Sequence, residues 1–201
     1  MQDPLSHCAR AFGPYWSKLG SVAFLSDLDQ ITRAAAGDPS AAAWLVDRYS
    51  PGVIGLATRM LGDRTEAEDV TQETFIRAWK ALPTWEPRAK FSTWLHRVAL
   101  NLCYDILRKR RESLPGELPE MTDPDMTPPE RLDQSERVHA IEAAIAALPE
   151  RQAAALTLCA LQGHSQAEAA EIMETSEEAL ESLLARARRR LRTTLAERSA
   201  A

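Results

Sequence analysis

Four side chains within residues 91–111 have the chemistry needed to bind single-stranded nucleic acid. At 100° per residue, Trp94, Arg97, Asn101 and Arg108 fall on one face of a predicted helix, together with Asp105. An aromatic ring can stack on an unpaired base, an amide can pair with a base edge, and guanidinium groups can hold phosphates. This face is therefore a candidate surface for single-stranded DNA. The alternative for Trp94 is a core position at the start of the helix.

The opposite face of the same segment is apolar and is predicted to pack against a core. Its members recur at helical spacing, and they are Leu95, Val98, Ala99, Leu102 and Ile106. The segment ends in a basic run at residues 108–111, which either extends the binding face or is simply solvated.

Residues 65–82 predict a second amphipathic helix, whose outer face has a different character. The positions predicted to point inward are Ala67, Val70, Phe75, Ala78 and Leu82. The outer positions are Asp69, Gln72, Glu73 and Ile76. Because carboxylates repel phosphate, acids and an amide around one exposed isoleucine suit a protein partner better than DNA. An ordinary charged surface is the alternative.

Residues 148–192 predict short helices joined by tight turns. A helix over 151–161 should end at Gly163, and Ser165 and Ser176 can each cap a further helix. The last helix has an inner stripe of Leu180, Leu183, Leu184, Ala187 and Leu191 and an outer stripe of Glu178, Ser182, Arg186 and Arg189. This pattern is typical of a helix-turn-helix that binds DNA, although a helical hairpin with solvated arginines fits the periodicity equally well.

The whole sequence predicts an all-α protein with two small helical domains joined by a flexible acidic linker. The 201 residues include only 8 Gly and 3 Tyr, and no long strand-like alternation occurs. We expect an N-terminal extension at 1–24, a first domain at 25–111, a linker at 112–134 and a second domain at 135–201. Breaks within the first domain are predicted at 37–39, near Pro51, at 62–63 and across 83–90.

Composition and spacing argue against several classes of protein. A net charge of −5 excludes a uniformly basic nucleic-acid binder. No Gly-rich phosphate loop, metal-ligand cluster or nucleophile–base pair appears, so we expect no enzyme, metal or cofactor. The spacing of Cys8, Cys103 and Cys159 favours free, buried thiols. Because neither a signal peptide nor a membrane-spanning run is present, we expect a cytoplasmic chain without membrane insertion.

These segments together resemble the extracytoplasmic-function sigma factors, sigma-70 family subunits with which bacterial RNA polymerase initiates transcription. The similarity lies in AEDVTQETFIRAWKAL (67–82), FSTWLHRVALNLCYDILRKRR (91–111), LPERQAAALTLCALQGHSQAEAAEIM (148–173) and SLLARARRRLR (182–192). It extends over about residues 25–195, and the order of these motifs is more specific than any one of them. The resemblance implies that the first domain is sigma region 2 and the second is sigma region 4.

The resemblance also implies partners and roles for the candidate residues. Core RNA polymerase would be bound through its β′ clamp helices and its β flap, and an anti-sigma factor would control the chain. The clamp helices would meet Asp69, Gln72, Glu73 and Ile76; the −10 element would meet Trp94, Arg97, Asn101 and Arg108; the −35 element would meet Ser182, Arg186 and Arg189. The loop at about 85–93 would capture a base of the opened −10 strand.

Acidic residues occur both in the linker and at the start of the last helix. The resemblance implies that the linker runs through the polymerase cleft toward the RNA exit channel, where its acids would occupy a basic path that otherwise holds RNA. These acids are Glu117, Glu120, Asp123 and Asp125, and solubility explains them almost equally well.

Where many family members begin the recognition helix with V-G-T-V-K-S-R, this chain has Glu177, Glu178 and Glu181, with Leu183 at a second position that is usually basic. Glutamate can accept a hydrogen bond from cytosine N4, which allows an altered base preference, so the sequence of the −35 element does not follow from these residues.

A conventional regulator that binds duplex DNA without polymerase is the alternative function.

Overall fold

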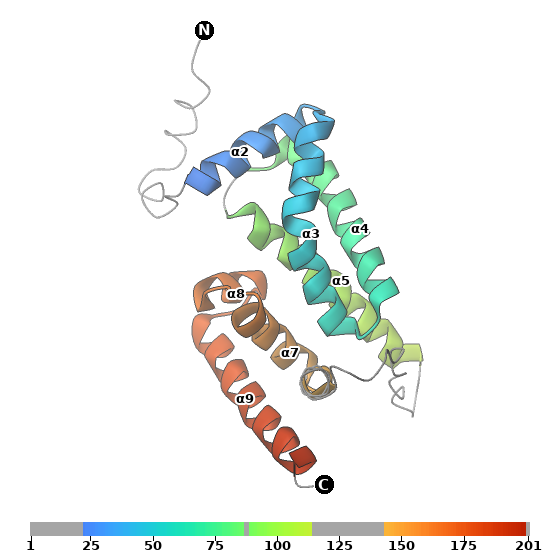
Figure 1. Ribbon diagram of the computed structural model, residues 1–201, viewed down its shortest axis with the longest axis vertical. Coiled ribbons are helices and arrows are strands. Elements are labelled where there is room, and N and C mark those ends of the chain that lie inside the picture. Colours follow the sequence, from blue (N-terminus) through green and yellow to red (C-terminus); the bar gives the residue numbers. More distant parts are fainter. Residues whose placement is uncertain (1–21, 87–88, 114–142, 200–201) are drawn as a thin grey trace, which may run out of the picture.

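The computed structural model describes residues 22–86, 89–113 and 143–199, and every regular element in these ranges is helical (Figure 1). The prediction of an all-α fold is therefore confirmed. The first group of elements is α2 (Val22–Ala35), α3 (Pro39–Leu61), α4 (Arg64–Ala81), the 3₁₀ turn η2 (Leu82–Thr84) and α5 (Phe91–Ser113). The second group is α7 (Glu150–Leu156), the π-helical turn η3 (Thr157–Leu161), α8 (Gln166–Ile172) and α9 (Glu177–Ser199).

Capping residues set the helix boundaries where the sequence predicted them. The Asp38 carboxylate accepts a hydrogen bond from the Ser40 N–H at 2.8 Å and so begins α3. Gly62 ends this helix in the left-handed region at φ 70°, and its N–H donates to the Thr58 carbonyl at 2.9 Å. Asp63 then caps α4 through the Glu66 N–H. The predicted breaks at 37–39 and 62–63 are confirmed.

The predicted break near Pro51 is wrong, because α3 continues through it to Leu61. Proline removes one helical hydrogen bond, but Pro51 and Asp47, four residues earlier, are both exposed, so water can satisfy the freed carbonyl. Buried Tyr49 and Val53 on either side hold the helix against the core. Two boundaries also shift: α2 begins at Val22, inside the expected extension, and α5 runs to Ser113, past the expected linker start.

The first group of helices packs around one apolar core. α3 contacts α2, α4 and α5, and its fully buried Leu45, Val53 and Leu56 lie at the centre. Phe91, the first residue of α5, makes ring contacts with Tyr49 of α3 at 5.5 Å between centroids and with Trp85 at 5.6 Å. Trp85, which follows η2, is thereby attached to the same core as α5.

The second group buries Leu158, Ile172, Leu180 and Leu184, which belong to the same continuous hydrophobic cluster as the buried residues of the first group. Ser165 begins α8 with a capping box: its hydroxyl accepts from the Glu168 N–H, and the Glu168 carboxylate accepts from the Ser165 N–H. The Ser176 hydroxyl accepts from the Ala179 N–H at the start of α9. Both predicted caps are confirmed.

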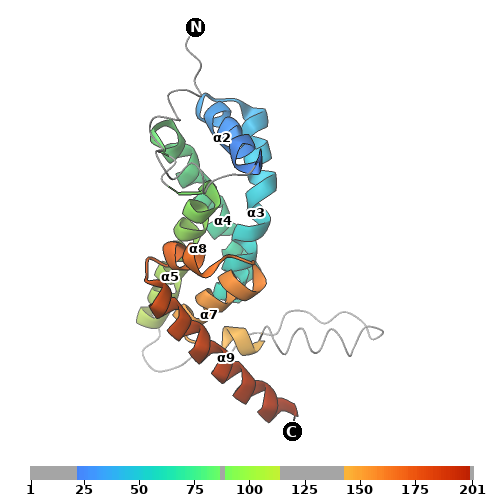
Figure 2. The same cartoon turned by 90° about the vertical axis from the view of Figure 1, so that its left-hand side faces the viewer.

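The two groups pack against each other. α8 lies beside α5, and α7 with η3 lies against α3, while α9 extends away from this contact (Figures 1 and 2). Residues 1–21, most of the expected linker and the start of the expected second domain lie outside the described residues. Among the helices that are described, none combines the length and the apolar character needed to cross a membrane.

Candidate nucleic-acid and protein interfaces

The buried face of α5 differs from the apolar stripe that the sequence predicted. Leu95 and Ala99 are buried as expected, but Val98, Leu102 and Ile106 are only half-buried. The buried face is instead completed by Phe91, Thr93, His96, Leu100 and Cys103. The helix is rotated toward these residues because α5 is covered on two sides, by α3 and α4 and by α8. A single hydrophobic stripe describes a helix with one covered side, and α5 has more than one.

The four candidate DNA-binding residues of α5 are not equally accessible. Asn101 and Arg108 are exposed, whereas Trp94 is half-buried and stacks on Phe91, with 6.2 Å between ring centroids. The guanidinium of Arg108 pairs with Asp105 at 2.8 Å within the same helix. Trp94 thus contacts the core on one side and is partly exposed on the other. It is neither a fully buried core residue nor a fully exposed surface for base stacking.

Arg97 lies where α5 meets α8. Its side chain is 29% exposed, and its guanidinium lies 3.6 Å from a Glu171 carboxylate oxygen and 3.8 Å from one of Glu174. The predicted stripe is therefore divided in this structure: Asn101 and Arg108 are open, and Arg97 is paired with acids of the second group.

The candidate protein-binding helix α4 has the orientation that the sequence predicted. All five inward positions are buried, Asp69 and Gln72 are exposed, and Ile76 is 38% exposed. Glu73 is half-buried and its carboxylate accepts from Arg77 at 2.8 Å. These residues lie along one edge of α4.

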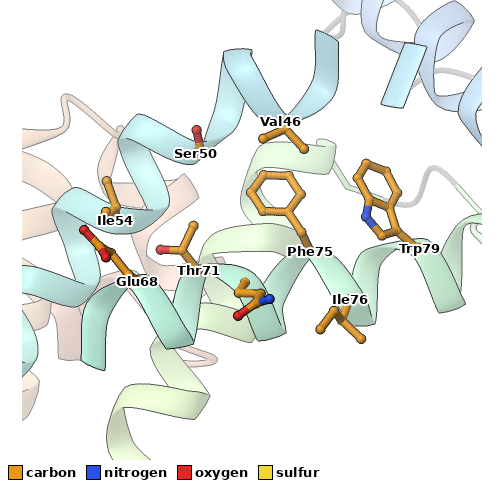
Figure 3. Close-up of a pocket in the computed structure, with 9 residues that line it drawn as sticks. Val46, Ser50, Ile54, Glu68, Thr71, Phe75, Ile76 and Trp79 are labelled. Carbon is orange, nitrogen blue, oxygen red and sulfur yellow. The ribbon is translucent and has the colours of Figure 1, made fainter. Parts of the chain in front are cut away.

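A groove of about 360 Å³ lies beside that edge, between α4 and α3 (Figure 3). Its apolar lining comes from both helices: Val46 and Ile54 of α3 lie across from Phe75 and Trp79 of α4, and Ile76 lines the groove from the outer side of α4. Periodicity within α4 identified Ile76, but the α3 side of the groove was missed because it depends on how the two helices pack. An apolar groove bordered by Gln72 and Glu68 can receive apolar side chains of a protein partner.

The exposed face of α9 carries the third group of candidates. Ser182, Arg186 and Arg189 are all exposed, and Leu180, Leu184 and Ala187 on the other side are buried. Arg186 and Arg189 make no side-chain ion pair with any residue in the described ranges. Glu177, Glu178 and Glu181 are exposed at the beginning of the same helix, so acids and bases follow one another along its outer face.

Titratable groups buried near these surfaces serve packing. Burial raises the pKa of the Cys103 thiol to about 12, which keeps it protonated, and burial also raises the pKa of Cys159. Both cysteines are free, as expected, but Cys159 is only half-buried, and Cys8 lies outside the described residues. In the described part of the chain, no three His, Cys, Asp or Glu side chains are placed to hold a metal ion.

Comparison with known proteins assigns both groups of helices to one family. The sequence model of Sigma-70 region 2 matches residues 45–113, and that of Sigma-70 region 4 matches residues 139–191. The chain is 36% identical over 174 residues to the ECF RNA polymerase sigma factor SigE of Mycolicibacterium smegmatis, covering 82% of this chain and 66% of that protein. It is 34% identical over 176 residues to the ECF RNA polymerase sigma-E factor of Haemophilus influenzae, covering 82% and 92%.

The share of each relative that is matched varies. Only 44% of the Bacillus subtilis SigW sequence is covered, at 44% identity over 82 residues. Among solved structures, CnrH in complex with the cytosolic domain of CnrY is similar with a TM-score of 0.66 and 30% identity, over 85% of this chain and 97% of that chain. RpoE of Bartonella quintana, solved with the anti-sigma factor NepR, has the same fold with a TM-score of 0.64 and 24% identity, over 76% and 95%. The chain belongs to the extracytoplasmic-function sigma factors of the sigma-70 family.

Proposed function

We propose that the chain is a promoter-specificity subunit of bacterial RNA polymerase and not an enzyme. In this proposal α4 binds the β′ clamp helices, the second group of helices also meets the β flap, α5 contacts the −10 strand and α9 contacts the −35 duplex. The observation that carries the proposal is that one core supports two outer faces of different chemistry. α4 presents acids beside an apolar groove, and α5 presents Asn101 and Arg108.

The different faces favour a sigma factor over a conventional regulator. A regulator that binds duplex DNA alone needs a basic surface, whereas the chain has a net charge of −5 and its α4 face is acidic. A polymerase partner explains that acidic face, because the enzyme would hold the subunit on the promoter and the DNA contacts of α5 and α9 need not bind tightly by themselves.

The test is transcription in vitro with bacterial core polymerase and a library of promoter fragments. We expect promoter-specific transcripts only when the chain is added. The double variant Asp69→Lys/Glu73→Lys should weaken core binding by about tenfold or more, because two attractive charges become repulsive. The helical content should be unchanged, since both positions are on the outer edge of α4.

A matched control is Asp29→Lys/Asp47→Lys, which makes the same change in net charge at two exposed positions of α2 and α3. Core affinity should stay at the wild-type value. Equal loss in both double variants would mean that net charge, and not the α4 edge, governs the binding.

Control by an anti-sigma factor is also part of the proposal, and it accords with CnrH having been solved with a protein partner. Such a partner would compete for the surfaces that polymerase needs, including the α3–α4 groove. The proposed function places the chain in the cytoplasm, where polymerase and chromosome are found.

A further inference from the structure

The groove between α3 and α4 is an apolar surface that remains open in the described part of the chain (Figure 3). Its floor includes Val46, Phe75 and Trp79. Ile76, at its outer side, is one of two large apolar side chains that are exposed within the described ranges. At about 360 Å³ the groove has the size of a small ligand pocket. An exposed apolar concavity of this kind indicates a surface that another segment or molecule covers.

The margin of this groove is polar and acidic. Ser50, Thr71 and Gln72 supply hydroxyl and amide groups, and Glu68 supplies a carboxylate. Asp69 is exposed on the same helix as Glu68 and makes no ion pair with any of the described residues. Tyrosine and tryptophan suit such a site, because the ring can lie on the apolar floor while the O–H or N–H reaches the polar margin. Bases next to those rings would be attracted to the acids of α4.

Residues 4–21 have the composition that this groove requires. Phe12, Tyr15 and Trp16 lie close together in this segment, which also contains Arg10 and Lys18. The segment has no acid, although the whole chain has a net charge of −5. Sequences that have no surface to pack against are usually poor in aromatic residues. The composition therefore favours binding of this segment to an apolar surface with acids at its margin.

The segment is joined to the chain near one end of the groove. It leads into α2, which contacts η2, and η2 directly follows α4, close to Trp79. With 14 residues, α2 is about 21 Å long, so Val22 lies within roughly that distance of the η2 contact. An extended chain spans about 3.3 Å per residue, so the stretch from Phe12 to Val22 can span about 33 Å. The segment is thus long enough to reach the Trp79 end of the groove in its own chain.

We propose that residues 4–21 bind back to the α3–α4 groove of their own chain, with the three aromatic rings on its floor and the two bases toward the α4 acids. The docking itself follows from the groove and the segment. Its consequence rests on the proposed function, which gives the same edge of α4 to core polymerase. Polymerase then has to displace the segment, so the apparent affinity of the free chain is reduced to the extent that the groove is occupied.

Docking is measured on the full-length chain with a nitroxide label on Cys8, four residues before Phe12. Cys103 is fully buried and is not expected to react, and the half-buried Cys159 is removed as Cys159→Ser. A paramagnetic label broadens the NMR signals of methyl groups that lie near it.

We expect broadening of the methyl signals of Val46, Ile54 and Ile76, which line the groove. The methyl signals of Leu191 should stay sharp, because α9 extends away from the first group of helices (Figure 1). A mixture of spin-labelled chain and isotope-enriched chain without the spin label distinguishes docking within one chain from docking between two copies. No broadening is expected in that mixture.

Two variants separate the aromatic side chains from the rest of the segment. Phe12→Ser/Tyr15→Ser/Trp16→Ser should lose the broadening, and the matched control Gln2→Ser/Pro4→Ser/His7→Ser should keep it. All six positions lie outside the described helices, so the circular dichroism of the three proteins should agree. The aromatic variant should bind core polymerase about threefold to tenfold more tightly than the wild type, as expected if the groove is free for about 10–30% of the time. The control should bind as the wild type does.

Several outcomes would overturn the proposal. Sharp groove signals in the wild type, broadening that persists in the aromatic variant, or broadening in the mixture of copies would each exclude docking within the chain. Equal core affinity of all three proteins would exclude competition with polymerase. Failure of the proposed function is distinguishable, because none of the three proteins would then bind core polymerase, while the broadening pattern would still support the docking.

Discussion

At the scale of single residues, the arginines at the end of α5 have different roles although they are adjacent in sequence. Arg110 donates to the Leu61 carbonyl at 2.9 Å and pairs with Glu66, so it ties α5 to the end of α3 and to α4. Arg111 reaches Glu150 of the second group, and Arg108 pairs within its own helix. Only Arg108 remains available on the proposed DNA-binding face.

Replacing Arg110 with Ala should therefore lower the free energy of unfolding by about 1 to 2 kcal/mol, because a charged hydrogen-bond donor to a helix C-terminus is lost. Urea unfolding measures this change. Lys109→Ala is the matched control, since Lys109 is exposed on the same turn, and its stability should match the wild type. Equal values for the two variants would contradict the structural role of Arg110.

Asn101 and Arg186 are proposed to contact different promoter elements, and both are exposed. Asn101→Ala should reduce transcription through its effect on the −10 element, and Arg186→Ala through the −35 element. A lost bidentate base contact should cost about 1–3 kcal/mol, and a lost phosphate contact less. Holoenzymes carrying each variant are assayed on promoters mutated separately in the two elements. Equal losses on every template would separate these residues from their proposed elements.

At the scale of elements, α8 is short and depends on its cap. It has seven residues, and the Ser165–Glu168 capping box satisfies two N–H groups at its beginning. The Glu168 carboxylate also accepts from Lys90, and chiefly this bond lowers the pKa of Glu168 to about 2. The stability that the ionised Glu168 carboxylate contributes is thus present above the ordinary pKa of a glutamate, and it is lost as the pH falls toward about 2.

Removal of the Ser165 hydroxyl should destabilise the second group of helices. We expect Ser165→Ala to lose about 1 kcal/mol in the free energy of unfolding and Ser165→Asn to lose much less, since asparagine also caps helices well. Urea titration followed by circular dichroism measures both. A Ser165→Asn protein as unstable as Ser165→Ala would indicate that packing of the hydroxyl, and not capping, is responsible.

At the scale of the whole molecule, the His96–His164 contact makes the packing of the two groups of helices sensitive to acid. Burial is the main cause that lowers the pKa of His96, to about 4, and that of His164, while Glu168 opposes the shift at His164 and Lys90 adds to it. Both rings therefore favour the neutral form in the folded chain. Since the unfolded chain takes up protons near pH 6.5, the folded chain loses stability as the pH falls from there toward about 4.

The free energy of unfolding should accordingly fall as the pH is lowered from about 7.5 to about 5. His164→Gln should reduce this pH dependence, because it removes one titrating group and the repulsion between two imidazolium rings. Urea unfolding of the two proteins across this range makes the comparison. Identical pH dependence would exclude His164 from the effect.

The sequence alone determined the features that depend on neighbouring residues. The breaks at 37–39 and 62–63, the cap at Ser165, the outward position of the α4 acids and the exposure of Arg186 all follow from local backbone preferences and helical periodicity. The order of the motifs likewise identified the family. These signals are carried within a few turns of one helix, so they can be read without the fold.

Only the tertiary structure decided which helix sides are covered and which charges meet. Pro51 inside α3, the buried His96 and the α3 half of the groove depend on packing between elements. Lys90 and Glu168 are 78 residues apart, and Gln162 and Gly52 are 110 apart, so no periodicity connects them. Such pairings arise from the summed packing of whole helices, because each contact alone is too weak to leave a recognisable pattern in the sequence.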